Sequence, residues 1–163
     1  AAALLLALAL ACAGVEVNLK RDAALRRELD GYRFPKALAV VWPSGIRLLA
    51  DRGHKLVGAD RAVAGQAAQG VLGGFLAKGF QTRATNRGLV LETDEDPTHL
   101  RYRMEGTATG HDTCRVLFVA VRRSEDDPSE VLARDVALEL ELVRRLEPDA
   151  AARIVEASES AAR

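Results

Sequence analysis

The feature that most constrains this chain is a series of strand-like segments between residues 80 and 122, separated only by short turns. Residues 80–85 and 89–93 flank an Asn-Arg-Gly turn, a pattern that predicts a β-hairpin. Apolar and charged residues alternate over 100–105, which is typical of a strand with one buried and one solvated face. Residues 113–122 are apolar on both faces and are expected to form a central strand. Because such short connections join antiparallel neighbours, an antiparallel sheet is predicted.

Two more strands are expected upstream of this series. The apolar run 37–42 is bounded by prolines and suits a buried strand better than a helix. The turn Pro43-Ser44-Gly45 then leads to a second expected strand over 46–50, which ends at a turn over 51–53.

Helical patterns lie on either side of the sheet-forming segments. Residues 22–29 suggest a short surface helix capped by Asp22, and 60–78 form an amphipathic pattern that contains several glycines. Asp127-Pro128-Ser129-Glu130 is a strong helix start. A stripe at helical spacing follows it, made of Leu132, Val136, Leu140 and Val143 and widened by Leu138, Leu142 and Leu146. We expect this long helix to reach Glu147-Pro148 and a shorter one to follow.

Strands joined by short turns, with helices at either end, indicate an α+β fold rather than alternating βαβ units. We predict a two-layer sandwich, in which an antiparallel sheet is packed by the glycine-containing helix and the long C-terminal helix. Residues 15–163 suit one domain, and no repeat or low-complexity linker divides them.

Residues 1–14 are expected to be a targeting segment. The run from Ala1 to Val15 is uncharged, rich in Ala and Leu, and ends in small residues, as secretory signals do. It is shorter than the roughly 20 apolar residues of a membrane-spanning helix. It also lacks the Met and positive segment that normally precede such a core, so further residues are expected upstream. With them, an uncleaved anchor becomes an alternative.

Cys12 carries two competing interpretations. Ala11 and Ala13 have the small size that signal peptidase prefers before Gly14, and cleavage there releases the protein. Alternatively, residues 8–12 resemble a bacterial lipobox in which Cys12 carries the lipid, although Ala9 and Leu10 stand in the opposite order to the usual pattern. Both predict export to the bacterial envelope, periplasmic in one case and membrane-anchored in the other.

Composition excludes some functions. Lys plus Arg and Asp plus Glu both number 23, so no net field attracts nucleic acid, and no nucleic-acid partner is expected. Cys114 is the only other cysteine, which leaves the mature chain without an internal disulfide. Its place beside an apolar strand predicts a small buried side chain rather than a reactive thiol.

No metal, cofactor or catalytic group is predicted. Asp94, Asp96, Thr98 and Glu105 imitate the spacing of a calcium loop, but His99 replaces the glycine that the loop's sharp turn needs. His99, His111 and Cys114 could meet as part of a zinc site, yet a fourth ligand is missing. His111-Asp112 with Cys114 is a poor triad, and Ser44 lacks a nucleophile motif. The row Arg101, Arg103 and Glu105 is either a partner-binding face or a solvated strand face.

The element order resembles one known group of domains. A helix ending in Lys78-Gly79-Phe80, a meander to Arg122 and a closing helix after Asp127-Pro128 look like the helix-grip domains of small exported lipoproteins. An example is the C-type lipoprotein of the outer-membrane β-barrel assembly machinery. The resemblance covers residues 36–147 and implies a noncatalytic domain that binds an envelope protein. The alternative is a carrier that holds an apolar ligand between the sheet and the long helix, for which an aromatic content of 4% supplies few pocket-lining rings.

Overall fold

The computed structural model describes residues 18–55, 83–85, 88–123 and 129–163. The chain divides into two compact units. One unit contains the residues before Arg33 together with Val143–Arg163, and the other contains Arg33–Leu142. The apolar run at the start with Cys12, and the glycine-containing helix expected over 60–78, lie outside the described residues.

The unit built from the two ends of the chain is helical. One helix covers residues 18–31, and α5 covers Pro148–Ser160. The first helix begins before Asp22, so the predicted cap at Asp22 is wrong, whereas its end at Gly31 and the break before Pro148 are confirmed. The buried side chains of the two helices are small or apolar: Ala24, Leu29, Ala151, Ile154 and Ser158. Among the helices that the structure describes, none has the length and apolar composition needed to cross a membrane.

A single helix, α2 (Leu38–Asp51), replaces the two strands predicted upstream of the sheet. The buried residues of this segment recur at helical spacing: Val41, Trp42, Gly45, Ile46, Leu48 and Leu49. Pro43 lies inside the helix and cannot donate a hydrogen bond to the carbonyl of Ala39, which costs about 3 kcal/mol. Burial of each large apolar side chain contributes about 1.5–3 kcal/mol, so the helical stripe outweighs the proline.

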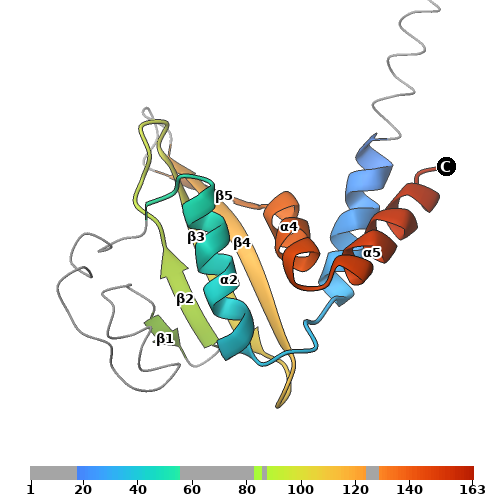
Figure 1. Cartoon of the computed structure of the whole chain (residues 1–163). Helices are drawn as coiled ribbons and strands as arrows, with labels where there is room; N and C mark the ends of the chain where they lie inside the picture. Colours follow the sequence, from blue (N-terminus) through green and yellow to red (C-terminus); the bar gives the residue numbers. More distant parts are fainter. Residues whose placement is uncertain (1–17, 56–82, 86–87, 124–128) are drawn as a thin grey trace, which may run out of the picture. The chain divides into compact units, whose positions relative to one another are not determined.

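Within the described ranges, the sheet has five antiparallel strands in chain order (Figure 1). They are β1 (Arg83–Thr85), β2 (Gly88–Glu92), β3 (Leu100–Ala108), β4 (Cys114–Arg123) and β5 (Glu130–Arg134). The predicted hairpin over β1 and β2, the alternation in β3 and the internal position of β4 are confirmed. In β4, Val116 and Phe118 are buried on one face, whereas on the other face Leu117 and Val119 are half-buried and Val121 is buried.

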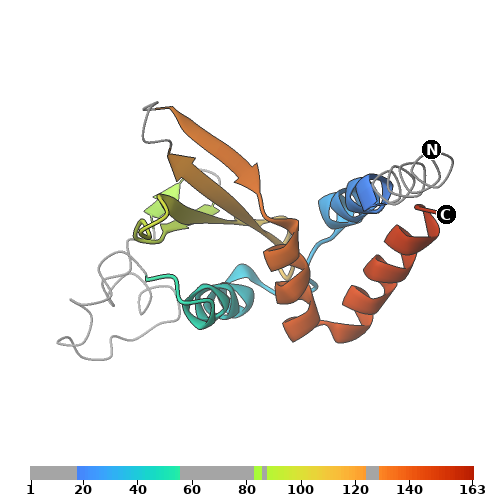
Figure 2. The same cartoon turned by 90° about the horizontal axis from the view of Figure 1, so that it is seen from above.

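Helix α2 packs across β3 and β4 on one face of the sheet, which is visible in Figures 1 and 2. Trp42, Met104 and Phe118 are fully buried in this layer. The approach is close, because a Cβ on Gly45 would lie 2.6 Å from Sδ of Met104. A Cβ on Gly106 would lie 2.7 Å from the indole of Trp42. The α+β fold with a helix-packed sheet is thereby confirmed, and side chains fill the contact between α2 and the sheet.

The helix predicted to start at Asp127 is wrong in its beginning, and its predicted apolar face is confirmed at Leu138, Leu142 and Val143 but not at Leu132 and Leu140. Residues 130–134 form β5, and α4 covers only Val136–Leu146. Asp135 caps α4, since its Oδ1 accepts a hydrogen bond from the N–H of Leu138 at 3.0 Å. The buried side chains of α4 are Leu138, Glu139, Leu142 and Val143, whereas Leu132 is exposed and Leu140 is half-buried. Pairing with β4 holds residues 130–134 in a strand, and the later of two competing caps therefore starts the helix.

Candidate functional site

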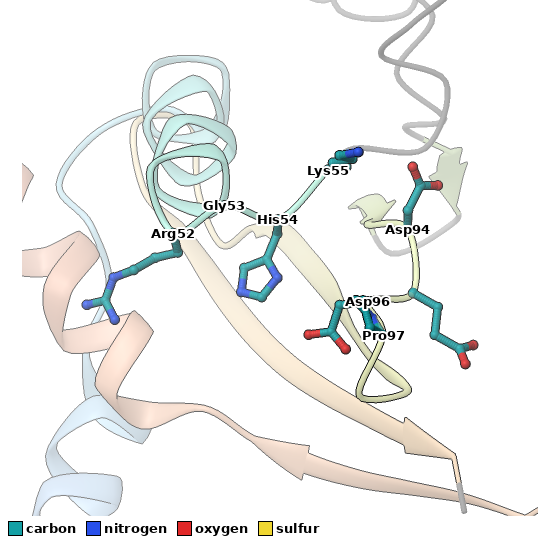
Figure 3. Close-up of a pocket in the computed structure, with 8 residues that line it drawn as sticks. Arg52, Gly53, His54, Lys55, Asp94, Asp96 and Pro97 are labelled. Atoms are coloured by element: carbon teal, nitrogen blue, oxygen red, sulfur yellow. The ribbon is translucent and has the colours of Figure 1, made fainter. Parts of the chain in front are cut away.

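A pocket of about 540 Å³ lies between the end of α2 and the loop that joins β2 to β3 (Figure 3). Gly53 ends α2 with a φ of 83°, a conformation that glycine adopts without strain. The next residue, His54, donates its backbone N–H to the carbonyl of Leu49 at 3.1 Å, which closes the helix end. Asp94 donates its N–H to the carbonyl of Lys55 at 2.7 Å and ties the two walls together.

One wall of the pocket is basic and the other is acidic. Arg52, His54 and Lys55 come from the end of α2, and Asp94, Glu95 and Asp96 come from the β2–β3 loop. In Figure 3 the side chains of His54 and Asp96 approach each other, whereas Arg52 points away from the acidic loop. The lining is therefore charged, which does not suit an apolar ligand.

Asp96 holds its own loop in shape. Its Oδ1 accepts hydrogen bonds from the hydroxyl of Thr98 at 2.7 Å, and from the N–H groups of Thr98 at 2.8 Å and Leu100 at 3.0 Å. The hydrogen bond from the Thr98 hydroxyl is the largest of the effects that lower the pKa of Asp96. Since the residues from 100 onward belong to β3, the calcium-like spacing over 94–105 reflects a self-bonded turn followed by a strand.

Tyr102 connects the pocket to the start of α4. Its ring lies 4.5 Å from the ring of His54, and its hydroxyl donates to Oδ2 of Asp135 at 2.9 Å. Burial, assisted by this hydrogen bond, raises the pKa of Tyr102 to about 12. The phenol is therefore protonated at neutral pH and acts as a fixed donor. The same Asp135 carboxylate caps α4, so this contact aligns the strand with the helix.

The face of the sheet that lies away from α2 carries a network of ion pairs. Arg101 bridges Oε2 of Glu92 and Oε1 of Glu130, both at 2.8 Å, and Nε of Arg103 lies 2.9 Å from Oε1 of Glu92. Arg123 also approaches Glu130, at 3.4 Å. The Glu130 carboxylate raises the pKa of Arg101, and Arg101 lowers that of Glu130. These pairs link β2, β3 and β5 across the sheet.

Strand β5 is the last strand of the sheet and forms its outer edge (Figure 1). Among the residues that the structure describes, it pairs with β4 alone, from Val119 opposite Arg134 to Arg123 opposite Glu130. Two of its side chains are large, apolar and exposed: Val131 is 62% and Leu132 is 56% accessible. An edge strand with exposed apolar side chains offers backbone groups and side chains to another strand.

Sequence reasoning missed this edge. The Asp-Pro pair at 127–128 is a genuine helix-start pattern, and the apolar spacing from Leu132 onward fits a helix as well as a strand. The adjacent pair Val131-Leu132 followed by a second capping residue, Asp135, was the available signal for a strand before the helix.

The structure separates the two histidines that were weighed as zinc ligands, but it holds His111 and Asp112 together, with 2.8 Å between Nδ1 of His111 and Oδ2 of Asp112. His99 precedes β3 and His111 follows it, so a nine-residue strand of roughly 30 Å lies between them. Cys114 is fully buried, as predicted, and burial raises its pKa to about 11. Ser44 lies within α2 rather than in a turn. Within the described ranges, no group of three or more His, Cys, Asp and Glu side chains is arranged to hold a metal ion.

No protein-family model matches the chain, and neither a curated protein nor a solved structure is significantly similar to it. The functional argument therefore depends on the geometry of the chain's own residues.

Proposed function

We propose that this chain is a noncatalytic interaction domain of the bacterial cell envelope, which binds another protein chain by adding its strand to the edge of β5. The observation that carries the proposal is the position of β5 at the rim of the sheet, with Val131 and Leu132 exposed. Addition of a strand to an open sheet edge is a recurrent mode of protein recognition, in which backbone hydrogen bonds supply affinity and alternate side chains supply specificity.

The surroundings of β5 support a rigid docking edge. Glu130 is bound by Arg101 and Arg123, and Arg134 is bound by Glu139 through two contacts of 2.6 and 2.7 Å. Both ends of the strand are therefore anchored by charged hydrogen bonds, which reduces the conformational entropy that binding must remove.

The alternative function, a carrier of an apolar ligand, receives less support. The contact between α2 and the sheet is filled to the point that two glycines are needed for the approach. The pocket at the end of α2 is lined by charged side chains. An apolar carrier needs an apolar cavity of a few hundred Å³, and neither feature offers one.

Export is the second part of the proposal, and it rests on the apolar run Ala1 to Val15. Cys12 is either the lipid-bearing residue or part of a cleaved segment, and both outcomes place the domain in the envelope. Lipid on Cys12 would add contact with the membrane to contact with a protein.

Site-specific photo-crosslinking tests the interaction. A photoreactive amino acid is placed at position 132 of the full chain, and in a matched variant at position 40, where Val40 of α2 is 57% exposed. The proposal predicts protein adducts in cells at position 132 and not at position 40. Absence of adducts at 132, or equal adducts at both positions, would contradict it.

A further inference from the structure

We infer that the strand added to β5 comes from a second copy of this chain, which pairs antiparallel about a two-fold axis at Leu132. The inference deepens the proposed function and rests on it, because it names the occupant of the same edge. Three properties of β5 carry it: the direction of its backbone groups, the order of its charges and the exposure of its central side chain.

The hydrogen-bond phase of β5 fixes which backbone groups face outward. Asp135 donates its N–H to the carbonyl of Phe118 at 2.8 Å, in register with the pairing of β4 and β5. Along an antiparallel strand, every second residue points its backbone N–H and C=O groups at the same neighbouring strand. The backbone groups of Val131 and Ala133 therefore also point toward β4. The N–H and C=O groups of Glu130, Leu132 and Arg134 therefore point away from β4, toward an added strand.

The sequence of β5 is complementary to itself when it is reversed. In Glu-Val-Leu-Ala-Arg, an antiparallel copy centred on Leu132 places Glu130 opposite Arg134 of the second copy, and Arg134 opposite its Glu130. Val131 then faces Ala133, and Leu132 faces Leu132. Opposite charges and apolar pairs that lie directly across two strands stabilise the pairing of those strands. A shift of the pairing by two residues would lose both charge pairs.

The same register uses every outward backbone group. The residues paired across the axis are 130 with 134, 132 with 132 and 134 with 130, and all of them face outward. Each such pair exchanges two hydrogen bonds, which gives about six between the copies. Glu130 and Arg134 keep their partners within the chain, so pairing buries no lone charge.

The predicted contact is small. A five-residue edge buries less than the roughly 1,200 Å² of a standard stable interface, so the dimer should be weak. Dissociation constants in the micromolar range or above are expected for a contact of this size. Analytical ultracentrifugation of the full chain must therefore cover concentrations from about 1 μM to 1 mM.

Two variants at the axis test the register directly. Because Leu132 faces Leu132, both Leu132→Lys and Leu132→Glu place like charges opposite each other. Each variant alone should lose at least about tenfold in dimer affinity, since directly opposed like charges destabilise a strand pair. An equimolar mixture should recover association as a heterodimer, because Lys then faces Glu. Val40→Lys changes an equally exposed apolar residue on α2 and should associate like the unmodified chain.

Other results would overturn the inference. A chain that stays monomeric up to about 1 mM while position 132 crosslinks to a different protein in cells would refute self-pairing and leave the proposed function intact. A dimer that is unaffected by both variants, or is weakened equally by Val40→Lys, would place the contact elsewhere. Failure of the mixture to associate when each variant alone is monomeric would refute the two-fold register.

Discussion

Gly106 sets the distance between α2 and the sheet. The ring of Trp42 and the side chain of Leu38 occupy the space where a Cβ would be, at 2.7 Å in both cases. Trp42 is fully buried, so its ring cannot move aside without disturbing its neighbours.

Gly106→Ala should therefore lower the free energy of unfolding by about 1–3 kcal/mol, the usual cost of overpacking a core. Gly31→Ala is the matched control, since a Cβ there meets nothing within 4 Å. Denaturant melts of both variants provide the measurement. Equal, small losses would show that α2 does not pack as closely as described.

The ionisation of Tyr102 makes the stability of the fold depend on pH. Its pKa is raised from the ordinary 10 to about 12, chiefly by burial and then by the hydrogen bond to Asp135. Since the folded pKa lies above the unfolded one, the protonated phenol stabilises the fold fully below about pH 10, and this stabilisation is lost as pH rises through 12.

In an alkaline titration, phenolate absorbance should show a late deprotonation that Tyr102→Phe removes. Tyr32→Phe alters the other of the chain's two tyrosines and should retain it. Deprotonation of both tyrosines near pH 10 in the folded chain would contradict the burial and bonding of Tyr102.

Among the elements, those with unambiguous periodicity were predictable and those with mixed signals were not. The alternation in β3 has a period of two and permits one interpretation, which the structure confirms. Residues 37–50 contain a helical stripe, but Pro43-Ser44-Gly45 interrupts it with residues typical of turns. The local residue types favoured two strands there. Helix α2 forms instead because it buries Trp42 and its neighbours against the sheet.

The centre of the buried face of α4 was not predictable once the start of the helix was misplaced, although Leu138, Leu142 and Val143 were expected in its apolar stripe. Leu142 is fully buried in the structure, whereas Leu140, the centre of the predicted stripe, is only half-buried. Leu142→Ala should cost about 2–5 kcal/mol of unfolding free energy, and Leu140→Ala clearly less. Denaturant melts of the pair decide: a larger loss for Leu140→Ala would restore the predicted face and contradict the observed one.

For the whole molecule, the sequence was sufficient for the α+β class and for the antiparallel order of β1 to β4, but not for β5. Turn residues and alternation are local, so they could be read directly from residues 83–122. The open edge at β5 depends on which of two caps, Asp127 or Asp135, starts the helix, and pairing with β4 makes that choice. The charged pocket was likewise hidden, because it joins residues 52–55 to 94–97 through the fold.

The proposed export concerns the whole molecule, and Cys12 distinguishes its two proposed forms. If Cys12 carries a lipid, Cys12→Ser should move the full chain from the membrane fraction to the soluble fraction. A soluble distribution of both forms would instead favour cleavage before Gly14. Mass spectrometry of the mature protein identifies the first residue and any lipid on it.

Amide hydrogen exchange at β5 tests the open-edge account most directly. In dilute solution, the N–H groups of Val131 and Ala133, which face β4, should exchange slowly, whereas that of Leu132 should exchange fast. As the concentration of the full chain rises toward about 1 mM, the Leu132 amide alone of the three should become markedly slower, because the edge becomes occupied. Uniformly slow exchange from 130 to 134 in dilute solution, or a Leu132 amide that does not respond to concentration, would contradict the account.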